Sequence, residues 1–398
     1  MATPSMTKTR ANTNPSPGPI EPVGQITGGA DTHLDFHLAA ARDGLGRTLG
    51  TRRFPATLAG YAALHAWLLG FGPLAMVGIE GTGSYGAGLS TYLTEQGVRV
   101  VEVNRPNRQK RRRTGKSDPA DAIAAAAAAQ SGEATATPKL RHGPVESVRV
   151  LRILRKQLVS ARTALLNTLH ALLLTAPAPL RESLHGLSTT ALLKACAALP
   201  APARPAKGLR GNKRIDANTQ LAQALRDNDT TVRAALAQLA DIIAEHDAHI
   251  GQLDTDLAVL IGVIAPRTLG LFGLGPDTTG QLLTTLAQRP EGLHSEAAFA
   301  RLSGVAPLDA SSGKHENHRL SRAGDRQANA ALYRITLTRL RYHQPSRDYL
   351  AGRLRPGTKH TKKHLIRCLK RYIAREIYPR LTADLAALNT HHQQALCA

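Results

Sequence analysis

Cysteine, aromatic residues and long hydrophobic runs are all scarce in this chain of 398 residues. The three cysteines (Cys196, Cys368 and Cys397) are scattered, which excludes a disulfide framework and a regularly spaced zinc site and favours a reducing, cytoplasmic location. Aromatic residues make up only 4%, which disfavours binding of single-stranded nucleic acid by base stacking. No apolar run reaches the roughly 18 residues of a transmembrane helix, so we expect no membrane association.

Acidic residues are also in the minority, with 29 Asp and Glu against 51 Lys and Arg, which gives a net charge of +22. Such an excess indicates a polyanionic partner, nucleic acid before membrane. Because aromatic residues are few, contacts from Arg and Lys to the backbone of a duplex fit better than base stacking. The length allows two or three domains, and a hydrophobic content of 42% allows a sizeable core.

Residues 25–135 alternate between strand and helix patterns. The pattern predicts strands at 26–30, 34–41, 47–54, 74–79 and 98–103, and helices at 55–69, 84–96 and 117–131. Three strands, helix, strand, helix, strand, helix is the element order of an RNase H-like domain, in which acids cluster at the first strand, the fourth strand and a late helix. Residues 1–24 are rich in Thr, Pro, Ser and Asn, lack the apolar core of a signal peptide, and are predicted to be a disordered tail.

Four acidic residues occupy those positions. Asp31 and Glu80 end two apolar runs, and Asp118 and Asp121 lie one helical turn apart at the start of an alanine-rich helix. Taken alone, Asp118 and Asp121 are better explained as acids in the first turn of a helix whose N-cap residue is Ser117. All four together favour a divalent cation, Mg²⁺ or Mn²⁺, because clustered acids repel one another, and the usual substrate of such a site is a phosphate ester.

A glycine motif offers an alternative. Gly81-Thr-Gly-Ser-Tyr-Gly86 has the G-x-G-x-x-G spacing of a dinucleotide-binding loop, and Glu102 follows where a ribose-binding acid would lie. Against this, the preceding strand is not the first of its domain, an arginine run follows, and Asp31, Asp118 and Asp121 stay unexplained. The glycines would instead let a substrate backbone pass close to Glu80.

Two segments are candidates for phosphate contact. A basic run beside the acidic cluster is predicted to bind nucleic acid through Arg108, Lys110, Arg111, Arg112, Arg113 and Lys116. The glycine loop at 272–276 resembles the hairpin of a helix-hairpin-helix element, whose amides at Gly273 and Gly275 would bind a duplex phosphate. An ordinary glycine turn explains that loop equally well.

The remainder of the chain is predicted to be mostly helical. Heptad patterns at 151–172 and 232–260 suggest an antiparallel coiled-coil hairpin or a dimer seam within residues 145–262, with a basic loop at 200–213. Residues 266–385 form a third region, followed by a tail at 386–398. In it, Ser311 and Ser312 lie in a small polar loop near Lys314, Arg319, Arg322 and Arg326. On local sequence alone, a plain surface loop explains the two serines better than a nucleophile.

Taken together, four stretches resemble the DEDD insertion-sequence transposases, the group that includes Piv-type DNA invertases and bridge-RNA-guided recombinases. They are Gly28-Gly-Ala-Asp-Thr-His33, Gly78-Ile-Glu-Gly-Thr-Gly-Ser-Tyr85, Lys116-Ser-Asp-Pro-Ala-Asp-Ala122, and Leu302-Ser-Gly-Val-Ala-Pro307 through Lys314 to Ala323-Gly-Asp-Arg326. Their order and spacing make the resemblance specific, and it covers most of residues 26–345.

The resemblance implies a RuvC-like N-terminal domain in which Asp31, Glu80, Asp118 and Asp121 bind Mg²⁺, and a C-terminal transposase domain whose nucleophile matches Ser312, with Ser311 as the alternate. It implies recombination of two DNA duplexes by phosphodiester transesterification, a structured guide RNA, and homodimers that pair into homotetramers. The RuvC-like site of one protomer would meet the serine of another. Two other functions stay open: a RuvC-like Mg²⁺-dependent junction nuclease without a covalent step, and a non-catalytic nucleic-acid-binding scaffold.

Overall fold

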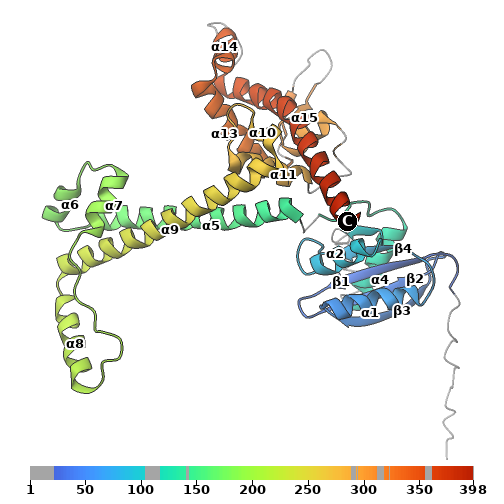
Figure 1. The fold of residues 1–398 in the computed structure, drawn as a ribbon, viewed down its shortest axis with the longest axis horizontal. Helices are drawn as coiled ribbons and strands as arrows, with labels where there is room; N and C mark the ends of the chain where they lie inside the picture. The colour runs from blue at the N-terminus through green and yellow to red at the C-terminus, as the bar shows by residue number, and fades with distance from the viewer. Residues whose placement is uncertain are drawn as a thin grey trace, which may run out of the picture. The chain divides into compact units, whose positions relative to one another are not determined.

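The computed structural model describes residues 22–103, 117–139, 143–287, 293, 295–311, 318–321, 323–354 and 361–397, without the side chains of 320 and 389–397. The chain divides into two compact units, Met1–Arg141 and His142–Ala398 (Figure 1). Most of the predicted N-terminal tail, the basic run at 104–116 and Ser312 lie outside the described residues. Within the described part, no helix combines the length and the hydropathy needed to cross a membrane.

The first unit is built on a mixed sheet of five strands in the order β3-β2-β1-β4-β5. The strands are β1 (Ile26–Thr32), β2 (Phe36–Arg42), β3 (Thr48–Pro55), β4 (Leu74–Glu80) and β5 (Val100–Val103). β2 pairs antiparallel with β1 and β3, whereas β4 pairs parallel with β1 and β5. The two antiparallel pairings distinguish this sheet from the mostly parallel sheet of dinucleotide-binding domains. The carboxyl ends of β1 and β4 therefore lie side by side.

Helices cover both faces of the sheet. α1 (Leu58–Leu69) and α2 (Ala87–Glu95) share a core with one face, which includes Ile26, Leu64 and Leu89. α4 (Asp118–Gln130) packs on the opposite face. Side chains alternate between faces along a strand, so a Cβ on Gly28 would meet Leu68 of α1, whereas a Cβ on Gly29 would meet α4.

α4 approaches the sheet unusually closely. A Cβ on Gly29 would lie 2.3 Å from both the carbonyl oxygen of Ala122 and the amide nitrogen of Ala126. A Cβ on Gly78 of β4 would lie 2.5 Å from the carbonyl oxygen of Ala125. Both distances are shorter than real contacts allow, so only glycine on the strands and alanine on the helix permit this packing. It brings the first turn of α4 to the carboxyl ends of β1 and β4.

The predicted elements of this unit are all present, with ends that differ by a few residues. Two helices begin three residues later than predicted: α1 begins at Leu58 instead of 55, and α2 begins at Ala87 instead of 84. Residues 81–86 form turns instead, in which the amides of Ser84 and Gly86 both donate to the carbonyl oxygen of Gly81. Gly81 has a φ of 77°, a conformation that side chains disfavour, so glycine suits the first residue of these turns.

The second unit contains two long helices, α5 (Gly143–Leu174) and α9 (Asn228–Ile264), which lie antiparallel along each other. Arg155 pairs with Asp254 and Arg162 with Asp247, one heptad apart on both helices. Residues predicted for the seam of α9, such as Leu236, Ile243 and Leu253, are buried. α6 (Ala178–Leu184) and α7 (Thr189–Ala197) share a core with the end of α5 and the start of α9, whereas α8 (Gly211–Ala224) buries no residue.

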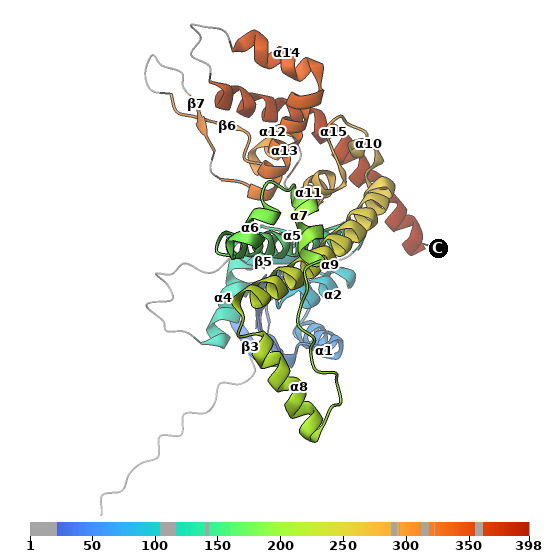
Figure 2. The same ribbon diagram turned by 90° about the vertical axis from the view of Figure 1, so that its left-hand side faces the viewer.

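The other ends of α5 and α9 join the C-terminal helices in a single core that includes Val148, Leu257, Leu282, Ile335 and Ile373. These helices are α10 (Pro266–Leu269), α11 (Pro276–Ala287), α12 (Glu296–Leu302), α13 (Arg326–Tyr342), α14 (Gln344–Arg353) and α15 (Lys362–Cys397) (Figures 1 and 2). A short hairpin, β6 (Pro307–Asp309) and β7 (His318–Leu320), lies between α12 and α13 in the sequence. α15 continues past residue 385, where we placed the start of a tail.

Gly78→Ala should lower the free energy of unfolding by about 1–3 kcal/mol, the usual cost of overpacking. Its Cβ would meet backbone atoms of α4, which cannot move aside as a flexible side chain can. Gly50→Ala on β3 is the matched control, because its Cβ would come no closer than 3.6 Å to any described atom outside its immediate neighbours. Denaturant unfolding of the full chain measures both changes. Equal stability of the two variants would show that α4 does not depend on this approach.

A buried histidine should make the stability depend on pH. His37 of β2 is fully buried and stacks on Tyr61 of α1 with ring centroids 5.5 Å apart, and neither ring nitrogen has a hydrogen-bond partner among the described residues. Burial, the main cause, lowers the pKa of His37 below its usual 6.5; His33 adds to the shift and the Phe36 backbone opposes it. Protons then bind the unfolded chain more tightly, so the free energy of unfolding falls as the pH drops below 6.5.

His37→Phe should reduce this loss of stability between neutral pH and pH 5, as measured by thermal unfolding. The loss should not vanish, because burial also lowers the pKa of His65. His249→Phe, at an exposed position of α9, is the control and should leave the slope unchanged. A wild-type slope in His37→Phe would contradict the assignment.

Candidate functional site

Asp31 and Glu80 lie at the carboxyl ends of neighbouring parallel strands. In the register between β1 and β4, Ala30 faces Ile79, so the next residues on each strand are these two acids. Gly29 and Gly78, two residues earlier, face α4, and the alternation of a strand puts Asp31 and Glu80 on that same face. The hydroxyl of Thr32 donates to the carbonyl oxygen of Glu80 at 2.8 Å and ties the two strand ends together.

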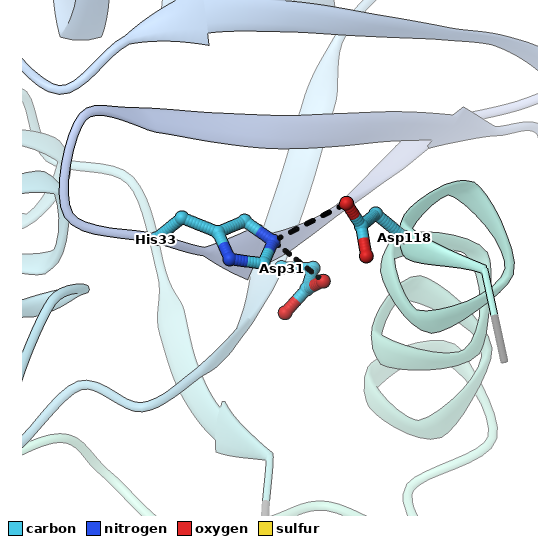
Figure 3. Close-up of side chains that lie close together, drawn as sticks. All are labelled: Asp31, His33 and Asp118. Carbon is cyan, nitrogen blue, oxygen red and sulfur yellow. Dashed lines mark hydrogen bonds and ion pairs between the residues drawn. The ribbon is translucent and has the colours of Figure 1, made fainter.

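α4 brings two further acids to this edge, both in its first turn. Asp118 is half-buried and Asp121 is buried. His33 Nε2 lies 3.2 Å from Asp31 Oδ2 and 3.7 Å from Asp118 Oδ2 (Figure 3). One ligand atom from each of Asp31, His33 and Asp118 lies within 4.8 Å of the others. The structure thus brings together Asp31 and Asp118, predicted from the sequence, and adds His33. Glu80 and Asp121 are not in this set of three, although the charge of Asp121 acts on Asp31.

The sequence-based prediction missed His33, although the signal was present. His33 follows Asp31 by two residues at the end of an extended strand, and residues with this spacing point to the same face. In the sequence, His33 stood out only as the last residue of the segment 28–33, one of the stretches that carry the family resemblance. A histidine two residues from a candidate metal ligand on a strand is therefore a position to test as a further ligand.

Helix capping does not fully explain the polar residues at the N-terminus of α4. Ser117 has the extended backbone of an N-cap residue, with φ of −141°, yet its side chain makes no capping hydrogen bond in the described structure. Asp118 faces His33 across the sheet edge. The acids of this first turn therefore serve more than the helix terminus.

The electrostatics of the cluster suit a cation. Burial, the largest cause, raises the pKa of Asp31; His33 opposes the rise, whereas the charges of Asp121 and Asp118 add to it. A carboxylate that is desolvated beside like charges is destabilised in its ionised form, and a bound cation would remove that cost. Two carboxylates and an imidazole within 4.8 Å of one another are a donor set that fits a divalent ion.

The second candidate element is the hairpin that leads to the two serines. The amide and the hydroxyl of Ser311 both donate to Asp309 Oδ1, at 3.0 and 2.5 Å, and the hydroxyl is the main cause that lowers the pKa of Asp309. Arg319 and Arg326 are exposed. Ser312, Lys314 and Arg322 lie outside the described residues, so their roles stay predictions.

Both ends of this hairpin are fixed to the helical core. The amide of Asp325 donates to the carbonyl oxygen of Leu302 at 2.6 Å. Asn329 Nδ2 donates to the carbonyl oxygens of Ser303 and Gly304, and Asn329 Oδ1 accepts from Lys370 Nζ at 2.9 Å. Lys370 is buried, and that burial, with a smaller contribution from Arg367, lowers its pKa. The segments that enter and leave the hairpin are thus held by α13 and α15.

Hydrogen bonds with residues of the same unit hold the glycine loop at 272–276 in place. The amide of Gly275 donates to Thr278 Oγ1 at 3.0 Å, at the start of α11. Arg339 donates through Nε to the carbonyl oxygen of Phe272 and pairs with Glu376. Phosphate contact by Gly273 and Gly275 stays a prediction, as does contact by the basic residues at 108, 110–113 and 116, which lie outside the described residues.

Comparison with known families agrees with this arrangement. A family model for DEDD transposases of the IS110 type, described as a transposase, matches residues 28–176, which include the sheet, α4 and α5. A second model, described as the transposase IS116/IS110/IS902 family, matches residues 267–351, which include the β6–β7 hairpin. A search of curated proteins finds no match. The two family matches, in this order along one chain, identify the protein as a member of the DEDD insertion-sequence transposases.

Proposed function

We propose that this transposase exchanges DNA strands through a divalent metal site formed by Asp31, Glu80, Asp118 and Asp121, and through a serine nucleophile, Ser312 or its neighbour Ser311. One observation carries the metal site: Asp31 and Asp118, on β1 and α4, converge with His33 within 4.8 Å in a chain of net charge +22. The first unit would be RNase H-like, which its strand order and its pairing pattern support.

The metal, when bound, would supply positive charge at the phosphoryl oxygens and at the leaving oxygen. The other roles in the reaction, including that of the nucleophile, would belong to residues of the chain. The serine hydroxyl would lose its proton and attack phosphorus, the phosphodiester bond would break, and the departing DNA oxygen would take up a proton. The new phosphoserine bond conserves the energy of the phosphodiester, so a DNA hydroxyl could later attack it and release the serine. Exposed Arg319 and Arg326 would offer charge to the phosphate.

The anchored hairpin supports a nucleophile at this position. A serine hydroxyl is a weak nucleophile and gains rate when it is held at the reacting phosphorus. Asn329 of α13 donates to the carbonyl oxygens of Ser303 and Gly304, just before the hairpin, and accepts a hydrogen bond from Lys370. Asp309, which accepts from the Ser311 hydroxyl, lies where a proton acceptor would be needed if Ser311 were the nucleophile.

We propose double-stranded DNA as the substrate, a structured guide RNA as a partner, and a homodimer or homotetramer as the active form. The family resemblance suggests the RNA and the assembly, and the net charge supports a nucleic-acid partner. The antiparallel pairing of α5 and α9 supports a coiled-coil role for these helices.

Asp31→Asn and Asp118→Asn should each lower the rate of strand exchange about 100-fold or more, the scale on which a positioned electrostatic group acts. Both substitutions keep the side-chain shape and remove a charge that would hold the cation. Nucleic-acid binding should persist. The matched control is Asp254→Asn, which removes a charge from the ion pair between α5 and α9 in the second unit. Strand exchange by the two site variants at the control's rate would exclude a metal site at Asp31 and Asp118.

Ser312→Ala should abolish formation of a covalent protein–DNA adduct while metal binding and DNA binding survive, because it removes one hydroxyl oxygen and little volume. Denaturing electrophoresis of the wild type stalled on a nicked substrate detects the adduct, and peptide mapping locates it. Ser311→Ala is the companion variant. An adduct that persists in Ser312→Ala but not in Ser311→Ala would assign Ser311. Metal-dependent cleavage with no adduct in the wild type would indicate a hydrolytic nuclease, and no cleavage at all a binding scaffold.

A further inference from the structure

We propose that His33 is a ligand of the metal and that its imidazole makes the site favour a transition ion such as Mn²⁺ over Mg²⁺. The proposal rests on the metal site proposed above and adds a residue and a selectivity to it. The donors expected for a DEDD site are four carboxylates, whereas the group that the structure brings together contains a nitrogen donor.

The distances fit two ligands on one ion. Neighbouring ligand atoms of an octahedral ion with bonds of about 2.1 Å lie about 3 Å apart. His33 Nε2 lies 3.2 Å from Asp31 Oδ2, which matches such a pair, and 3.7 Å from Asp118 Oδ2, which requires a small inward movement. In Figure 3 the same ring nitrogen faces both carboxylates. The donor atoms therefore already surround one position.

The imidazole is held in place by the turn between β1 and β2. The amide of His33 donates to the carbonyl oxygen of Phe36 at 3.0 Å, which closes the turn. The imidazole stacks on the ring of Phe36 with centroids 4.6 Å apart, and the guanidinium carbon of Arg53 lies 3.4 Å from the centroid of that ring. The side chain of His33 is still 32% exposed, so an ion can reach it. Stacking thus orients the ring and leaves Nε2 available.

The competing explanation is a simple ion pair. A protonated His33 could bridge Asp31 and Asp118 as a counter-ion, and an arriving metal would then displace it without bonding to nitrogen. The two explanations differ in one observable, which is whether nitrogen is bonded to the bound ion. They also differ in selectivity, because Mg²⁺ takes oxygen ligands, whereas imidazole is a good ligand for transition ions.

The test uses Mn²⁺ as the probe, bound to the full-length protein, with electron spin-echo modulation as the readout. The wild type should show coupling to a directly bonded ¹⁴N nucleus, and His33→Gln should lose it. His33→Gln should also weaken Mn²⁺ binding about 10-fold or more, since even partners outside the ligand sphere contribute that much. Mg²⁺ affinity should change much less, so the ratio of the Mn²⁺ to the Mg²⁺ affinity should fall.

His65→Gln, at a half-exposed position of α1 in the same unit, is the matched control and should keep both the nitrogen coupling and the affinity ratio. Phe36→Leu removes the stacking partner and keeps the ligand, so it should weaken Mn²⁺ binding while the nitrogen coupling remains. Circular dichroism and Mg²⁺ binding check that each variant is folded.

Three results would overturn the proposal. Bound Mn²⁺ without nitrogen coupling in the wild type would show that His33 is only a counter-ion. Coupling that survives in His33→Gln would assign the nitrogen to another residue. If His33→Gln left the ratio of the Mn²⁺ to the Mg²⁺ affinity unchanged, His33 would not determine the metal selectivity of the site. Failure of the wild type to bind either ion at this site is a different result, because it would also remove the metal site of the proposed function.

Discussion

The contact between α4 and the sheet is the constraint on which the site depends. Gly29 and Gly78 leave no room for a side chain under the helix, and the alanines above them let its backbone approach. Asp118 and Asp121 therefore reach the edge where β1 and β4 end. A larger residue at either glycine would lift the helix and separate its acids from Asp31. The small side chains of Ala126 and Ala129, which lie at this contact, fit the close approach.

Acids gathered in this way cost stability in the absence of a cation. Burial and the charges of Asp121 and Asp118 disfavour ionisation of Asp31, and the neighbouring imidazole offsets part of that effect. The fold tolerates the cost because the strand ends and α4 are held by backbone packing, away from the acids themselves.

Much of the first unit followed from sequence pattern. Alternating apolar residues and glycine punctuation predicted its strands and helices, and acids at strand ends predicted the edge where they meet. The two-residue spacing in the sequence puts His33 on the same face as Asp31, but its approach to Asp118 depends on the turn that stacks its ring on Phe36. The sequence also could not show which of the four acids form a group with His33, since that depends on side-chain orientation. Heptad spacing predicted an antiparallel hairpin or a dimer seam, and the ion pairs Arg155–Asp254 and Arg162–Asp247 show the antiparallel pairing of α5 and α9 within the chain.

The hairpin in the second unit illustrates a different limit of prediction from sequence. Its residues are small and polar, and locally they predict nothing but a loop. The base of the hairpin is distinctive. There the side-chain NH₂ group of Asn329 donates to two backbone carbonyl oxygens, and its side-chain oxygen accepts a hydrogen bond from Lys370, which lies far along the sequence on α15. A buried lysine ammonium group is costly unless it is paired or hydrogen-bonded. Here the bond that offsets part of this cost also orients Asn329, whose side chain holds the segment at Ser303 and Gly304 that leads into the hairpin, so the start of the hairpin depends on an interaction within the helical core.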